Sequence, residues 1–308
     1  DFNIQDWSSK ILDRYEIPRK LFAEIVHPGT INCCTDSLTN RKLRTKGFPV
    51  ATVCEHDTAS AFLAAADNSG CAIISCGTWA LVGCETPAPI IQEYGCQYNI
   101  ANEGGFKGHH RILKNVMGTW LLQEIRAELH SPKKQYSYSK MEQEAAKAEP
   151  LRYLIDVDDE TFYSPGNMIG KLQSYCKKYY GSYPDTSGAL IRCIYESLAL
   201  KYRWNLEKLH TLTGIDFHMV NILGGGSLSA LMCQFTSNAS GLPVIAGPVE
   251  ATALGNMIVQ LIALKQISCI AEGRQLIHSS VNTTEYLPQD THIWDKQYLH
   301  FKSLFCLD

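Results

Sequence analysis

One acidic residue, Asp57, stands where a strand pattern gives way to a helix pattern. The apolar, β-prone run 49–54 predicts a buried strand, and after the polar stretch 55–60 the alanine-rich run 61–66 predicts a helix. Open α/β sheets bind ligands beyond the carboxyl ends of their strands, so a carboxylate here could accept a proton from a bound substrate. Asp is also a favoured capping residue, and a purely capping role for Asp57 stays open.

Two glycine-containing turns could hold a phosphate. Gly77 and Thr78 join two apolar stretches. Glycine there lets a ligand approach the backbone, and threonine offers a hydroxyl and an amide to phosphate oxygens. Gly224, Gly225 and Gly226 lie between a strand pattern and a helix pattern, where bare amides suit a phosphate. An ordinary hairpin turn is the alternative at Gly77, and a flexible connector is the alternative at the glycine triplet.

The pattern of apolar residues predicts the elements that must position these side chains. We expect strands over 71–76, 79–83, 217–223 and 243–246, and helices over 6–25 (broken at Pro18), 113–129, 166–180, 188–213, 228–239 and 250–264. From residue 217 onward strands and helices alternate, which is typical of the α/β class. The small residues Ala251, Thr252, Ala253 and Gly255 are expected to let the last helix pack closely.

The composition is that of an ordinary globular chain. It has 308 residues, 45% hydrophobic and 19% charged, with a net charge of −3, which argues against disorder and gives no sign of a nucleic-acid partner. No apolar run approaches a membrane span, so we expect no membrane partner. The 12 Cys lack the spacing of a zinc site, so we expect reduced thiols, no bound metal and a cytoplasmic protein.

Seven short segments in a fixed order resemble the FGGY carbohydrate kinases. They are HDTASA (56–61), GTW (77–79), NEGG (102–105), LKNVMG (113–118) with WLLQ (120–123), ESLAL (196–200), GGGS (224–227) and PVIAGPVEA (243–251). The resemblance implies an actin-like, ribonuclease H-like α/β fold that binds ATP between two domains. It also implies transfer of the ATP γ-phosphate to a ketose hydroxyl. The branch that acts on L-rhamnulose is the most similar, and L-fuculose and xylulose stay open as alternatives.

The resemblance assigns roles position by position. Asp57 is similar to the family's catalytic base, and three residues are similar to sugar-contacting positions: His56, Thr58 and Asn115. ATP contacts are implied at Gly77, Thr78, Gln123, Gly224, Gly225 and Gly226. The implied cofactors are ATP and Mg²⁺, the implied partners are the ketose and ATP, and we expect a monomer or a homodimer.

The chain resembles the C-terminal portion of the family's sequence. Residues 1–66 are then the tail end of the N-terminal domain, including the catalytic loop, and residues 67–308 form the C-terminal FGGY domain. The last ~30 residues are expected to pack back on the N-terminal domain. Nothing before Asp57 resembles the family's N-terminal phosphate loop. We therefore expect this chain to be inactive alone, and a non-catalytic nucleotide-binding fragment or a scaffold domain stays open.

Overall fold

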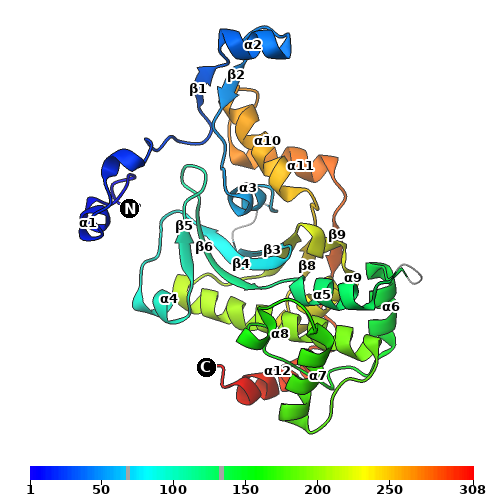
Figure 1. The fold of residues 1–308 in the computed structure, drawn as a ribbon. Helices are drawn as coiled ribbons and strands as arrows, with labels where there is room; N and C mark the ends of the chain where they lie inside the picture. The colour runs from blue at the N-terminus through cyan, green and yellow to red at the C-terminus, as the bar shows by residue number, and fades with distance from the viewer. Residues whose placement is uncertain (67–69, 132–134) are drawn as a thin grey trace.

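A seven-stranded mixed sheet forms the centre of the computed structural model, which describes residues 1–66, 70–131 and 135–308 (Figure 1). The strand order is β5-β6-β4-β3-β7-β8-β9. The bounds are β3 Cys71–Cys76, β4 Trp79–Thr86, β5 Ala101–Glu103, β6 His110–Met117, β7 Met219–Leu223, β8 Val244–Ala246 and β9 Thr284–Tyr286. Strands β3, β7 and β8 run parallel, and the other neighbours are antiparallel. The predicted α/β class is confirmed.

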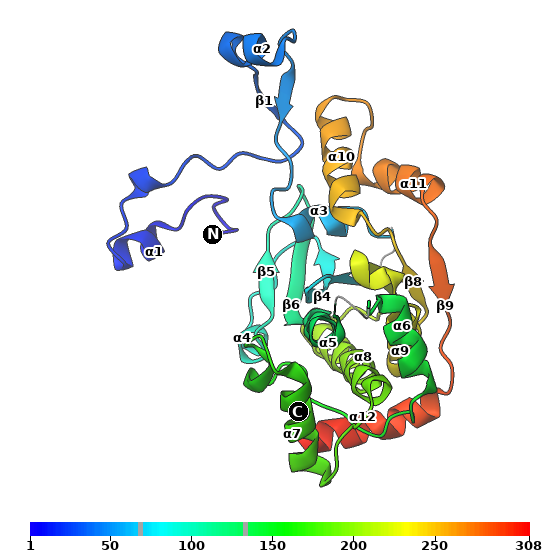
Figure 2. The ribbon, with the colours of Figure 1, turned by 45° about the vertical axis from the view of Figure 1, so that its right-hand side comes forward.

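Helices cover both faces of this sheet (Figures 1 and 2). On one side lie α5 Trp120–Leu129, α6 Tyr138–Lys147, α7 Met168–Tyr180, α8 Ser187–Thr213, α9 Ala230–Ser240 and α12 Thr291–Phe305. On the other side lie α3 Asp57–Leu63, α10 Ala251–Ala263 and α11 Ile270–Ser280. Each side has its own apolar core, the larger around α8 and the smaller between α3, α10 and the sheet. The short helix α4 Glu93–Gln97 precedes β5.

Strand β6 corrects the predicted helix 113–129. Residues 113–117 belong to β6, and α5 begins only at Trp120. The side chains alternate, because Ile112 and Val116 enter the larger core while Leu113 enters the smaller one. The helical spacing of the apolar residues therefore runs across a strand-to-helix boundary. Asn115 shares the face of Leu113, which is the face that α3 covers.

The first 51 residues project away from the sheet (Figure 2), whereas Cys54 is buried in the smaller core. They contain α1 Ser9–Arg14, a 3₁₀ turn Arg19–Leu21, β1 Ile31–Cys34, α2 Ser37–Leu43 and β2 Pro49–Ala51. The predicted buried strand 49–54 is wrong, since β2 is short and its Pro49 and Val50 are exposed. Strand β2 pairs only with β1, so no second layer covers it. The second helix predicted within 6–25 is only the 3₁₀ turn.

Helix α10 lies directly against α3, and one glycine permits this contact. A Cβ atom on Gly255 would lie 1.8 Å from the carbonyl oxygen of Ser60. The Thr252 hydroxyl donates a hydrogen bond of 3.2 Å to the carbonyl oxygen of Asp57. The predicted close packing is confirmed for Gly255 and Ala251, which are buried, whereas Thr252 and Ala253 are exposed. The position of Asp57 therefore depends on α10.

The C-terminal region packs within this chain. Strand β9 pairs with β8, and Trp294, Tyr298 and Phe301 of α12 are buried in the larger core. The Trp294 ring lies 5.4 Å from the Phe235 ring of α9. Contact of the last residues with an N-terminal domain stays a prediction. The predicted domain boundary at residue 67 lies outside the described residues.

The ESLAL segment of α8 supports the fold rather than a ligand. Glu196 is 1% exposed, accepts a bond of 2.7 Å from Arg192 Nε and one of 2.9 Å from the backbone N–H of Leu151. Ser197 accepts a bond of 2.9 Å from the backbone N–H of Ile155. Burial raises the pKa of Glu196 to about 7, against the opposing effect of Arg192.

No helix within the described residues is both long and apolar enough to span a membrane. The 12 Cys all fall within the described residues and carry free thiols.

Replacing Gly255 with Ala is expected to lower the free energy of unfolding by at least about 2 kcal/mol, because the methyl group would force two backbones apart. Urea unfolding followed by circular dichroism measures this change. Gln260→Ala, on the exposed side of the same helix, is the control and is expected to change stability by less than about 0.5 kcal/mol. Equal stability of Gly255→Ala and the wild type would contradict the contact.

The raised pKa of Glu196 predicts that the free energy of unfolding depends on pH. Because its pKa is higher in the folded than in the unfolded chain, its ionisation opposes folding, and stability falls as pH rises from about 4.5 to about 7. Relative to Glu196→Gln, the wild type is expected to lose roughly 3 kcal/mol across this window. Urea unfolding of both proteins at pH 4.5, 6 and 7.5 measures the difference, and parallel pH profiles would refute it.

Candidate functional site

The two glycine-containing turns lie side by side at one edge of the sheet. The first follows β3 and the second follows β7, and these strands are parallel neighbours, with Ser75 opposite Leu223. A Cβ atom on Gly224 would lie 3.0 Å from the carbonyl oxygen of Cys76, and one on Gly226 would lie 2.4 Å from its Sγ. Residues far apart in sequence thus form one surface at the carboxyl ends of two strands.

The three glycines of the second turn differ in what requires them. Gly224 has a φ of +77°, a left-handed conformation that favours glycine. Gly226 is required by its contact with Cys76. Gly225 is exposed, and a Cβ atom there would meet nothing within 4 Å. Since the described fold makes no use of the missing side chain at Gly225, the open space beside it is available to a ligand.

The glycine triplet does not open an α-helix, which corrects the prediction. Residues Gly225–Leu228 form a 3₁₀ turn, and α9 starts at Ala230. The side chain of Ser229 caps α9 by accepting a bond of 3.2 Å from the backbone N–H of Met232. The cap lies beyond the triplet, so any ligand at Gly225 meets a turn rather than the N-terminus of α9.

Gln123 reaches the first turn from α5. Its Nε2 lies 3.3 Å from the Thr78 hydroxyl and 2.9 Å from the Thr119 hydroxyl. The Gly77 carbonyl oxygen accepts bonds from the Thr119 backbone N–H at 2.9 Å and from the Thr119 hydroxyl at 2.8 Å. Thr78 and Gln123, both predicted to contact ATP, are thereby brought together. Thr119 is a further member that the sequence interpretation missed, because it assigned this boundary to a helix interior.

Asp57 is the first residue of α3, and His56 occupies the capping position without a side-chain bond. The Asp57 carboxylate is exposed and makes no hydrogen bond or ion pair with the described residues. The capping alternative is therefore wrong, and so is the placement of Asp57 at a strand of the central sheet. A short segment links Asp57 to the glycine triplet: the Gly224 N–H donates to the Pro248 carbonyl at 3.2 Å, and Thr252 binds Asp57.

The predicted sugar-contacting residues differ in accessibility. The His56 side chain is 56% exposed, and Asn115 is exposed on the face of the sheet that α3 covers. Thr58 is buried at 5% exposure, so little of its surface is open to a ligand.

A charged cluster that the sequence interpretation missed lies beside His56. Arg111 of β6 and Glu103 of β5 form an ion pair of 2.9 Å, and both lie 3.4 Å from the Nδ1 atom of His56. Burial lowers the pKa of Arg111, while Glu103 opposes this shift. Glu103 belongs to the NEGG segment, which the sequence interpretation had singled out. Only the register of β5 and β6 shows that Arg111 lies opposite Glu103.

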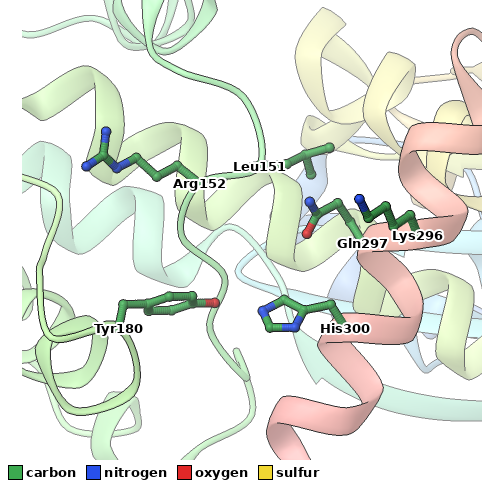
Figure 3. Close-up of a pocket in the computed structure, with 6 residues that line it drawn as sticks. All are labelled: Leu151, Arg152, Tyr180, Lys296, Gln297 and His300. Carbon is green, nitrogen blue, oxygen red and sulfur yellow. The ribbon is translucent and has the colours of Figure 1, made fainter.

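Among residues 1–66, 70–131 and 135–308, no group of three or more His, Cys, Asp or Glu side chains is placed to hold a metal. Figure 3 shows a pocket of about 360 Å³ where Tyr180 faces His300 of α12, lined also by Leu151, Arg152, Lys296 and Gln297. None of the predicted site residues lines this pocket, and the Tyr180 hydroxyl is bound to the backbone of Leu154.

Solved structures share the fold. The xylulose kinase from Rhodospirillum rubrum aligns with a TM-score of 0.70 and 15% identity, over 97% of this chain and 60% of that one. The glycerol kinase from Plasmodium falciparum with ADP aligns with a TM-score of 0.72 and 15% identity, over 99% and 59%. The predicted actin-like, ribonuclease H-like fold is confirmed.

Curated relatives extend the similarity to sequence. The rhamnulokinase of Bacteroides thetaiotaomicron is 39% identical over 297 residues, which cover 96% of this chain and 60% of the relative. The rhamnulokinase of Bacillus subtilis is 37% identical over 285 residues, which cover 91% and 58%. The chain thus spans about 60% of the length of these relatives. Residues 72–264 match the C-terminal domain of the FGGY family of carbohydrate kinases. The chain belongs to this family.

Proposed function

We propose that the protein transfers the γ-phosphate of ATP to a hydroxyl group of a ketose. The observation that carries this proposal is the adjacency of the turns at Thr78 and Gly225, at the carboxyl ends of β3 and β7. Bare backbone and a threonine hydroxyl on one surface suit phosphate oxygens. Membership of the FGGY family supports a sugar as the acceptor.

L-rhamnulose is the proposed ketose, and L-rhamnulose 1-phosphate is the proposed product. Relatives named rhamnulokinase support this choice, since they are 36–39% identical across more than nine-tenths of the chain.

In the proposed mechanism, Asp57 accepts the proton of the attacking hydroxyl. Its carboxylate has no partner among the described residues, so its oxygens are open to a substrate that comes within about 3 Å. His56, Thr58 and Asn115 contact the sugar, with Thr58 contributing least because it is buried. The phosphates lie against Gly224–Gly226 and against Gly77 and Thr78, and Gln123 contacts the nucleotide. Phosphoryl transfer requires mainly positioning and charge neutralisation, which such an arrangement supplies.

The described residues contain no group of three or more His, Cys, Asp or Glu side chains placed to bind Mg²⁺. Mg²⁺ in kinases usually keeps several waters and binds one or two carboxylates together with substrate phosphates. We propose that Mg²⁺ is required and arrives on the phosphates of ATP.

We further propose that the exposed part of residues 1–66, up to the end of β2, belongs to a domain that the relatives carry in the part of their length outside the match, whereas α3 packs on the central sheet of this chain. Of the first 50 residues only Leu12 is buried, whereas Trp7, Ile11, Leu21 and Phe48 are exposed. Apolar surface of this kind marks a contact with another part of a protein. The nucleotide and sugar sites are then shared between two domains, and the central sheet with the helices packed on it, α3 included, supplies the C-terminal share.

Gly225→Ala is expected to weaken ATP binding about 10-fold, because the methyl group takes the space proposed for phosphate. Its stability is expected to stay within about 0.5 kcal/mol of the wild type, since nothing in the described fold lies there. Gly226→Ala is the matched control and is expected to lose at least about 2 kcal/mol of stability by overlapping Cys76. Calorimetric ATP titration and urea unfolding measure both quantities, and unchanged ATP affinity in Gly225→Ala would refute the assignment.

Asp57→Asn is expected to lower kcat for L-rhamnulose by roughly 100- to 10,000-fold with little change in either KM, because the amide cannot take the proton. Glu55→Gln removes a neighbouring exposed carboxylate and is expected to retain wild-type turnover. A coupled ADP-release assay on the protein from its whole coding sequence measures these values.

The isolated 308-residue chain is expected to show negligible turnover in the same assay. Wild-type turnover by Asp57→Asn would exclude Asp57 as the base. Sugar-dependent turnover by the isolated chain would exclude the shared site.

A further inference from the structure

A buried arginine ties the loop before α3 to the edge of the sheet. Arg111 is 3% exposed and donates from Nη2 to the Gly104 carbonyl at 2.7 Å. The same nitrogen lies 2.9 Å from Glu103 Oε2, and Nη1 lies 3.4 Å from His56 Nδ1. The Phe62 ring of α3 lies 6.0 Å from the guanidinium carbon. The NEGG segment, which has no role in the proposed mechanism, is thereby joined to the sugar-contacting loop.

The burial of Arg111 is costly and calls for an explanation. Its Nε has no hydrogen-bond partner among the described residues, although it is shielded from solvent. A buried charge contributes little net stability unless its bonds are complete. The two Nη atoms, which do have partners, face His56 and the NEGG turn. Arg111 is therefore placed to act on His56 rather than to stabilise the core.

The contact between Arg111 and His56 restricts the imidazole proton. A guanidinium can only donate hydrogen bonds, so the facing Nδ1 must accept and carries no proton. The proton of neutral His56 then lies on Nε2. Glu103 also lies 3.4 Å from Nδ1, but this contact meets only the distance of an ion pair. Glu103 Oε2 also forms its 2.9 Å contact with Arg111 as an ion pair by distance, and it accepts no hydrogen bond from the described residues. Since only the contact between Arg111 and Nδ1 has hydrogen-bond geometry, Arg111 sets the tautomer and the charge of Glu103 holds Arg111 in place.

We infer that Arg111 and Glu103 are positioning residues that hold His56 as the Nε2–H tautomer, so that it donates a hydrogen bond to an oxygen of the sugar. This inference rests on the proposed function for its substrate. His56 and Asp57 are consecutive, exposed residues, so a donor stands beside an acceptor. The pair suits a polyol with one oxygen that accepts from Nε2 and a neighbouring hydroxyl that gives its proton to Asp57.

The direct test is the tautomer of His56. Nitrogen NMR of ¹⁵N-histidine-labelled protein, with His56 assigned by His56→Gln, is expected to show an unprotonated Nδ1 and a protonated Nε2 in the neutral imidazole. Arg111→Lys keeps the positive charge but lacks the planar guanidinium group, so both tautomers of His56 are expected to be populated. A protonated Nδ1 in neutral wild-type His56, or an unchanged tautomer in Arg111→Lys, would overturn the inference.

The kinetic test separates positioning from a loss of structure. In the protein from its whole coding sequence, Arg111→Lys is expected to raise the KM for L-rhamnulose about 10-fold, as one hydrogen bond is lost, with the KM for ATP unchanged. Arg274→Lys is the matched control, because Arg274 is also buried and binds Glu85 and the carbonyls of Phe62 and Leu63, away from His56. It is expected to lower stability and leave the sugar KM unchanged.

Misfolding of a variant, failure of this inference and failure of the proposed function give different results. If Arg111→Lys does not fold, Glu103→Gln replaces it and is expected to raise the sugar KM about 3-fold with a partial tautomer change. An unchanged sugar KM in an active Arg111→Lys or Glu103→Gln, or an equal rise in Arg274→Lys, would overturn the inference. A wild-type protein that phosphorylates no ketose would refute the proposed function, and the tautomer measurement would still decide the role of Arg111.

Discussion

The backbone contact between α3 and α10 positions the candidate base. Helix α3 has only seven residues and begins without a side-chain cap, so its own propensity cannot hold it. What holds it is burial: Thr58 to Leu63 are all buried, and the apolar residues among them lie in the smaller core, against α10 and the sheet. The absence of a side chain at Gly255 lets the two helices approach, and Thr252 then reaches the Asp57 carbonyl. A side chain at Gly255 would move the carboxylate without touching it.

The same segment connects the base to the phosphate surface. Between the bond of Pro248 to Gly224 and the bond of Thr252 to Asp57 lie only a few residues of chain. The position of Asp57 therefore depends, through the smaller core, on the edge of the sheet where the glycine triplet lies. The larger core around α8 supplies rigidity, and its buried ion pair of Glu196 with Arg192 binds backbone far from either turn.

The glycine triplet shows why residue type alone is an incomplete guide to function. Gly224 is needed for a left-handed backbone, Gly226 for contact with Cys76, and only Gly225 leaves space that the described fold does not use. In the sequence the three residues are identical. Their roles separate only when φ and the neighbouring atoms are known.

The sequence alone determined the family and the α/β class and predicted most residues of the candidate site, because a family resemblance is carried by short contiguous segments such as HDTASA and GGGS. It could not determine the strand β6, since the spacing of Val116 and Trp120 fits a helix across a boundary that only sheet pairing reveals. It could not place Asp57 on α3 beside α10, nor join Arg111 to Glu103 and His56. Those contacts connect residues distant in sequence, and the packing of two cores on one sheet decides them.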